Sequence, residues 1–137
     1  MLHKIPARLF TLILGDVFLF GLVTVVGFSR HGELVGAGLR LLTTFLPLCA
    51  AWSLMAPWLG VFDLSRVGQP GQLWRPLLAM VLAAPMAGWL RGLWLGEAIP
   101  PVFVLVIGAF SALGILLWRG LWILLLRARL GKQVLHG

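Results

Sequence analysis

The sequence predicts an all-α, polytopic membrane protein: an antiparallel bundle of four transmembrane helices. Of its 137 residues, 61% are hydrophobic. Only 15 are charged, eleven Lys or Arg and four Asp or Glu. A soluble domain carries charge on about a quarter of its residues, and a disordered chain is polar, so both classes are excluded. Four continuously apolar stretches have the length of about 20 residues that crosses a bilayer, and they lack the alternation of a transmembrane barrel.

The first two spans differ in their charge. We expect the first helix over residues 9–28, where Asp16 alone interrupts the apolar run. Lys4 and Arg8 precede it, as basic residues precede the apolar part of a signal peptide. No small-residue cleavage site follows, so we interpret this segment as a retained helix. We expect the second helix over residues 41–62, a stretch without charge.

The third and fourth spans each contain an arginine. We expect the third helix over residues 76–96, with Arg91 near its end, and the fourth over residues 101–126, with Arg119 inside it. The connections between spans are short, so consecutive helices should be antiparallel neighbours. The four spans together make a single integral membrane domain over residues 1–137.

Prolines and small residues indicate how these helices bend and pack. Three prolines inside spans predict kinks, because proline lacks the N–H of a helical hydrogen bond: Pro47, Pro57 and Pro85. Helices in lipid associate through small residues that let their backbones approach closely. Such residues recur at four-residue spacing in the third and fourth spans: Ala84, Gly88, Gly92 and Gly96, and then Gly108 and Ala112.

The basic residues predict the orientation. Seven lie on one side of the expected membrane: Lys4, Arg8, Arg66, Arg75, Arg127, Arg129 and Lys132. Three lie on the other: Arg30, Arg40 and Arg91. Because positive residues accumulate on the cytoplasmic side, we expect both termini on the cytoplasmic side of the inner membrane. The net charge of +7 then reports topology, and we expect no nucleic-acid partner. Six of the seven tryptophans fall near the expected interfaces, whereas Trp52 lies near the middle of the second span.

Asp16 and Arg119 are charges within expected spans. Each lies eight residues from a basic residue at the cytoplasmic end of its helix, which places both about 12 Å inside the membrane. Arg119 shares a helical face with Gly108 and Ala112. Since an unpaired charge in a span is costly, we predict that Asp16 and Arg119 form a buried ion pair. The pair could fix the helix register or act as a proton or ion relay; alternatively, Arg119 could extend to the surface.

A second polar cluster is expected at the opposite surface: Arg30, His31, Glu33, Arg40, Arg91 and Glu97. It could receive an anionic headgroup or solute, or it could be an ordinary solvated loop. No Cys or His cluster has metal-ligand spacing, so we expect neither a metal nor a cofactor. The sequence also lacks a nucleophile with a base at workable spacing and paired carboxylates, which argues against an enzyme.

Several short segments carry a family resemblance: Gly15-Asp16, GFSRHG (27–32), APWLG (56–60), APMAGWLR (84–91), FVLV (103–106) and Trp118-Arg119. Their order and spacing resemble the domain of unknown function 3054 family, small membrane proteins of bacteria and archaea, over residues 12–125. The resemblance implies a four-helix membrane protein without an established activity. It implies these positions for testing: Asp16, Arg30, His31, Pro57, Arg91, Trp118 and Arg119. Leu46-Pro47-Leu48 departs from the pattern, which has phenylalanine after the proline.

Two functions remain open. The first is a small transporter or channel-like carrier that acts as a homo-oligomer, because four helices enclose little space. The second is an accessory or assembly subunit of a larger membrane complex. In both, the partners are the lipid bilayer and either a second copy or another membrane protein.

Overall fold

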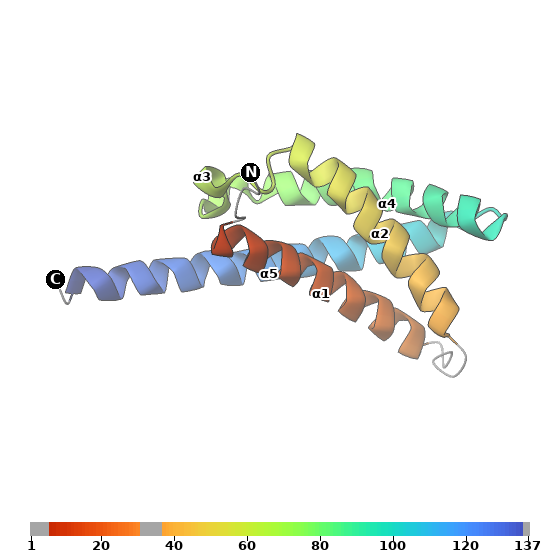
Figure 1. The fold of residues 1–137 in the computed structure, drawn as a ribbon, viewed down its shortest axis with the longest axis horizontal. Helices are drawn as coiled ribbons and strands as arrows, with labels where there is room; N and C mark the ends of the chain where they lie inside the picture. Colours follow the sequence, from red (N-terminus) through yellow and green to blue (C-terminus); the bar gives the residue numbers. More distant parts are fainter. Residues whose placement is uncertain (1–5, 31–36, 136–137) are drawn as a thin grey trace.

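The computed structural model describes residues 6–30 and 37–135, which fold into helices without a strand. The elements are α1 (Ala7–Arg30), α2 (Gly38–Trp58), α3 (Leu64–Val67), the 3-10 turn η1 (Pro70–Gln72), α4 (Trp74–Leu95) and α5 (Pro101–Leu135), drawn in Figure 1. The four long helices are each long and apolar enough to cross a membrane. The predicted all-α fold class is therefore confirmed, and the chain is a multi-pass membrane protein.

Two helix boundaries differ from the predicted spans by more than three residues. The helix α2 ends at Trp58, before the expected residue 62, because Gly60 turns the chain with a left-handed φ of 65°. At the other end of the chain, α5 continues past residue 126 to Leu135. Its last turns are rich in Arg, Leu and Lys, which favour helix outside lipid as well as inside it. At 35 residues α5 is about 52 Å long, so it extends beyond a hydrocarbon core of about 30 Å.

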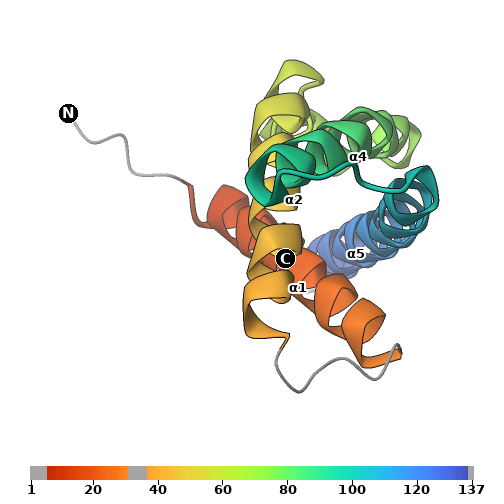
Figure 2. The ribbon, with the colours of Figure 1, turned by 90° about the vertical axis from the view of Figure 1, so that its right-hand side faces the viewer.

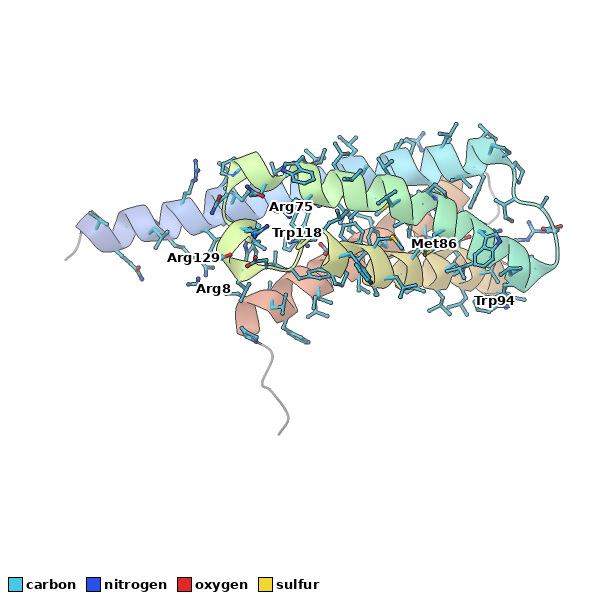
Figure 3. All side chains as sticks on the ribbon, turned by 90° about the horizontal axis from the view of Figure 1, so that it is seen from above. Arg8, Arg75, Met86, Trp94, Trp118 and Arg129 are labelled. Atoms are coloured by element: carbon cyan, nitrogen blue, oxygen red, sulfur yellow. The ribbon has the colours of Figure 1, made fainter. Side chains whose placement is uncertain are left out.

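The long helices form a closed ring of neighbours. The helix α4 packs against α2 and α5, and α1 packs against the same two helices from the other side, as the end-on view of Figure 2 shows. The start of α1, the α2–α4 connection and the projecting end of α5 lie at one end of the bundle, which we call the termini end (Figure 1). Figure 3 shows Arg8, Arg75 and Arg129 toward this end and Trp94 toward the opposite end.

Small residues line the contact between α4 and α5. A Cβ atom at Gly108 would lie 2.8 Å from Ala84 Cβ, and one at Gly88 would lie 2.5 Å from Val104 Cγ2. Ala112 packs against the same core. Ala84 and Gly88 of the expected small-residue seam on α4 are thus in contact with α5 of the same chain. Further alanines on α4 are buried: Ala79, Ala83 and Ala87.

The two last glycines of that seam do not contact another helix. A Cβ atom at Gly92 would lie 2.9 Å from the backbone oxygen of Glu97, in the turn that follows α4. Gly96 ends α4 with a left-handed φ of 68°, and its N–H donates to the carbonyl of Gly92. Within the chain the two glycines serve the turn after α4, because the chain reverses direction here and a left-handed residue at a helix end is usually glycine. Packing of both against a helix of another chain stays a prediction.

The three prolines lie within α-helices. Pro47 and Pro57 are part of α2, and Pro85 is part of α4. Pro47 is buried, whereas Pro57 and Pro85 lie on exposed faces. The kinks expected at these positions stay a prediction.

Two glycines of α1 have different surroundings and offer a matched test of its packing. A Cβ atom at Gly15 would overlap the rigid indole ring of Trp118, whereas one at Gly27 would meet nothing within 4 Å. We expect Gly15→Ala to lower the free energy of unfolding by roughly 1–3 kcal/mol, as overpacking does. Gly27→Ala should be neutral or stabilising by up to about 1 kcal/mol. Thermal unfolding of both variants in detergent checks this, and equal effects would contradict the close approach at Gly15.

Candidate functional site

The helices α1 and α5 approach each other through two reciprocal glycine contacts. The indole ring of Trp118, on α5, packs against Gly15 on α1. In return, a Cβ atom at Gly114 on α5 would lie 2.8 Å from Leu19 Cδ1 on α1. Small residues at such crossings let two backbones come close in lipid. This crossing places Asp16, the next residue after Gly15, against α5.

The structure brings Asp16 and Arg119 into direct contact inside the bundle. Arg119 Nη2 lies 2.7 Å from Asp16 Oδ2, within the distance of a charge-assisted hydrogen bond. The Arg119 and Asp16 side chains are only 3% and 1% exposed. Arg119 therefore does not extend to the surface, which was one of the alternatives from the sequence. Two charges at this depth offset each other, whereas either one alone would be an uncompensated charge.

Residues from α2 and the turn after it complete the surroundings of the pair. The indole Nε1 of Trp52 donates a hydrogen bond to Asp16 Oδ2 at 3.3 Å. Arg119 Nη1 donates to the carbonyl of Val61 at 3.3 Å, and its guanidinium lies 5.7 Å from the ring of Phe62. The site therefore joins α1, α2, the turn after α2 and α5.

Several polar side-chain atoms of α1 and α5 have no hydrogen-bond partner among the described residues. They are Asp16 Oδ1, Arg119 Nε, Trp118 Nε1 and Ser111 Oγ, and all are buried. A buried polar atom without a partner costs roughly 1–3 kcal/mol. The interior of the bundle therefore has donors and acceptors that are able to hold a small polar group beside the ion pair.

A small cavity extends from the α2–α4 connection to Arg119. Its volume is about 20 Å³, and its polar lining comprises Arg66, Gln69, Gln72, Arg75 and Arg119. Arg66 and Gln69 are exposed, whereas Arg119 is buried. The lining thus runs from the surface at the termini end to the ion pair. A cavity of this volume has room for about one water-sized group.

The connection that covers this cavity is held by Asp63. Its Oδ1 accepts hydrogen bonds from the backbone N–H of Ser65 at 3.0 Å and from the Ser65 hydroxyl at 2.6 Å, which caps α3. Its Oδ2 pairs with Arg66 Nε at 3.0 Å. These Ser65 hydrogen bonds, and to a lesser extent the positive charge of Arg66, lower the pKa of the Asp63 carboxyl.

The second predicted cluster, at the opposite end, is brought together only in part. The guanidinium of Arg91 donates to the hydroxyl of Thr44 and lies 4.9 Å from the ring of Phe103. It also donates at 3.4 Å to the carbonyl of Arg40. Arg30 is exposed at the end of α1, and Glu97 is exposed in the α4–α5 connection. His31 and Glu33 lie outside the described residues.

Several members of the site are not predicted from the sequence. Trp52 was singled out only for its depth, and that unusual depth was the available signal that it serves Asp16. The carbonyl of Val61 and the cavity lining carry no sequence signal, because they depend on how the α2–α4 connection folds back over α5.

Comparison with known proteins finds a family. The family model described as protein of unknown function (DUF3054) matches residues 13–122. No curated protein and no solved structure is significantly similar to the chain.

Exchange of the two charged residues tests the pair. Asp16→Arg alone, or Arg119→Asp alone, should lower the free energy of unfolding by about 3–5 kcal/mol, because each leaves like charges buried together. The double exchange should recover part of that loss; it should not recover all, because Trp52 and Val61 are placed to serve the native arrangement. Thermal unfolding in detergent measures the three variants. A double variant no more stable than either single variant would refute the pairing.

Proposed function

The chain belongs to the DUF3054 family of proteins of unknown function, and from that premise we propose that it is a small carrier of protons or small ions. In this proposal Asp16 and Arg119 are the relay point, and the protein acts as an oligomer in the cytoplasmic membrane. The proposed role is not enzymatic. It develops one alternative from the sequence, in which the Asp16–Arg119 pair relays a proton or ion.

The observation that supports this proposal is the buried pair with its unpartnered atoms. Asp16 Oδ1 and Arg119 Nε are buried without a partner among the described residues, beside a cavity that reaches Arg119 from the termini end. An ion pair that served only to hold two helices together would be most stable with every polar atom hydrogen-bonded. Ionisable residues within membrane spans commonly mark the path of a proton or ion.

Protonation of Asp16 supplies a mechanism for the relay. A proton on the Asp16 carboxylate would remove the negative charge that faces Arg119 Nη2 at 2.7 Å. Coulomb energies are large in the low-dielectric interior, so this one event would weaken the attraction between α1 and α5 strongly. The loss of a proton would restore it. Two arrangements of the α1–α5 crossing, exchanged by one proton, are what a carrier requires.

The size of the cavity supports an oligomer. At about 20 Å³ it holds about one water-sized group and extends only from the termini end to Arg119. A path across the whole membrane then needs surfaces from a second copy or a change in the α1–α5 crossing.

The distribution of basic residues supports the orientation. Six of those that the structure describes belong to the termini end: Arg8, Arg66, Arg75, Arg127, Arg129 and Lys132. Three belong to the opposite end: Arg30, Arg40 and Arg91. By the positive-inside rule, we propose that the termini end faces the cytoplasm.

Proton flux into liposomes tests the carrier. The purified chain is reconstituted with a pH-sensitive dye inside the liposomes, and a potassium gradient with valinomycin drives proton entry. We expect the wild-type protein to acidify the interior faster than empty liposomes do. Asp16→Asn should reduce the rate to that of empty liposomes, because the amide cannot take up the proton, and Asp16→Glu should retain flux.

Glu97→Gln is the matched control, since Glu97 is an exposed acid of the α4–α5 connection. It should conduct as the wild-type protein does. Wild-type flux equal to that of empty liposomes, or equal flux in Asp16→Asn, would refute the relay.

An open groove favours a second candidate, an accessory or assembly subunit. The end of α4 and the start of α5 leave a groove of about 820 Å³ between them. Its apolar lining includes Trp89, Leu93 and Leu105. Gly88, Gly92 and Gly96 lie in the same lining. Helices of another membrane protein pack well against such small and apolar residues.

Native mass measurement separates the two candidates. After gentle detergent extraction from the source membrane, the carrier proposal expects masses that are multiples of the 15.0 kDa chain. The accessory proposal expects a foreign subunit in fixed stoichiometry. Stoichiometric foreign subunits would contradict an independent carrier, and homo-oligomers alone would contradict the accessory role.

A further inference from the structure

We propose that the cavity between the α2–α4 connection and α5 binds one small monovalent anion, with chloride as the representative ligand. The inference concerns binding, and it stands without the carrier proposal. It rests on three properties of the cavity: an excess positive charge, unused N–H donors, and a small volume.

Of the guanidinium groups that line the cavity, one makes no ion pair with a carboxylate of the described residues. Three arginines line it. Arg66 pairs with Asp63 at 3.0 Å, and Arg119 pairs with Asp16 at 2.7 Å. The third, Arg75, is bound by uncharged groups, as its Nε donates to Gln72 Oε1 at 2.6 Å and its Nη1 to the carbonyl of Leu59 at 2.7 Å.

The three arginines of the lining therefore have two paired carboxylates between them, those of Asp63 and Asp16. Opposite charges at such a partly desolvated site attract strongly, and a single negative charge would neutralise it. A monovalent anion satisfies this balance, whereas a cation would add to the excess.

The lining also supplies N–H donors, which favour an anion as the ligand. The Nε–H of Arg119 is buried and has no partner among the described residues, although Arg119 is part of the lining. Arg75 uses Nε and Nη1 for Gln72 and Leu59, which leaves the donors of its other nitrogen. Guanidinium N–H groups cannot accept hydrogen bonds, so an acceptor with negative charge suits them best.

Gly60 makes room for this arrangement. It has a left-handed φ of 65°, and a Cβ atom there would lie 3.4 Å from Arg75 Nη1. The turn after α2 thus brings its backbone against the guanidinium and holds it at the cavity. The ring of Trp74 lies 4.8 Å from the same guanidinium and supports it from another side.

The volume favours a small anion. About 20 Å³ holds about one water-sized group. Chloride is only slightly larger than a water molecule, whereas phosphate, sulfate and organic carboxylates are several atoms across. The exposed side chains of Arg66 and Gln69 at the rim give the ion a route from the solution at the termini end.

Chloride-dependent unfolding of the full chain tests the site. The purified protein in detergent is heated at constant ionic strength while chloride replaces gluconate, and unfolding is followed by tryptophan fluorescence. We expect the unfolding temperature to rise with chloride and to saturate, because a ligand bound only by the folded state stabilises it. Sulfate and phosphate should give no such rise.

Three variants locate the effect. Arg75→Gln should weaken chloride binding roughly tenfold or more, because it removes the uncompensated charge and its donors. Val67→Leu keeps every charge but adds a methylene group to the cavity lining, and it should also weaken chloride binding because it takes up space in the cavity. Arg127→Gln removes an exposed arginine of α5 outside the cavity and should respond to chloride as the wild-type protein does.

Several results would overturn the proposal. One is a rise without saturation, or an equal rise in sulfate, since either reports general salt effects. Another is an unchanged chloride response in both Arg75→Gln and Val67→Leu. If Arg75→Gln does not fold, Val67→Leu alone decides, because it leaves the charges in place.

Discussion

A lone carboxylate or guanidinium is costly inside a lipid bilayer, and this constraint explains much of how the bundle is built. Asp16 and Arg119 come from the first and last long helices, so their contact at 2.7 Å joins α1 to α5 and closes the ring of four. The reciprocal contacts of Gly15 and Gly114 allow the two backbones to approach that closely. Trp52 then ties α2 to the same carboxylate, so three of the four spans meet at one charge pair.

The same pair links the interior to the surface at the termini end. Val61, in the turn after α2, accepts a hydrogen bond from Arg119, so the buried charge is in contact with the α2–α4 connection. That connection forms a small arginine-lined cavity over it. The buried pair therefore takes part both in the packing of the helices and in the cavity at the termini end. Its charged groups have partners from α1, α2, the turn after α2 and α5.

The sequence predicted much of this fold because the bilayer restricts the possibilities. Apolar length predicted four helices, and the cost of charge in lipid predicted that Asp16 and Arg119 belong together. Four-residue spacing also identified Ala84 and Gly88, which pack against α5. Other features depend on details that no helical period carries: the reversal at Gly96, the length of α5 beyond residue 126, and the path of residues 59–73 over the pair. The cavity was missed for that reason.

The ionisation state of Asp16 is the most direct test of the central role of the pair. Infrared difference spectra of the protein in lipid, wild type against Asp16→Asn, detect the carbonyl band that only a protonated carboxyl shows. At neutral pH we expect no such band from Asp16 in the wild-type protein and its appearance in Arg119→Gln, where the compensating charge is gone. A protonated carboxyl band in the wild-type protein that Arg119→Gln leaves unchanged would contradict the account.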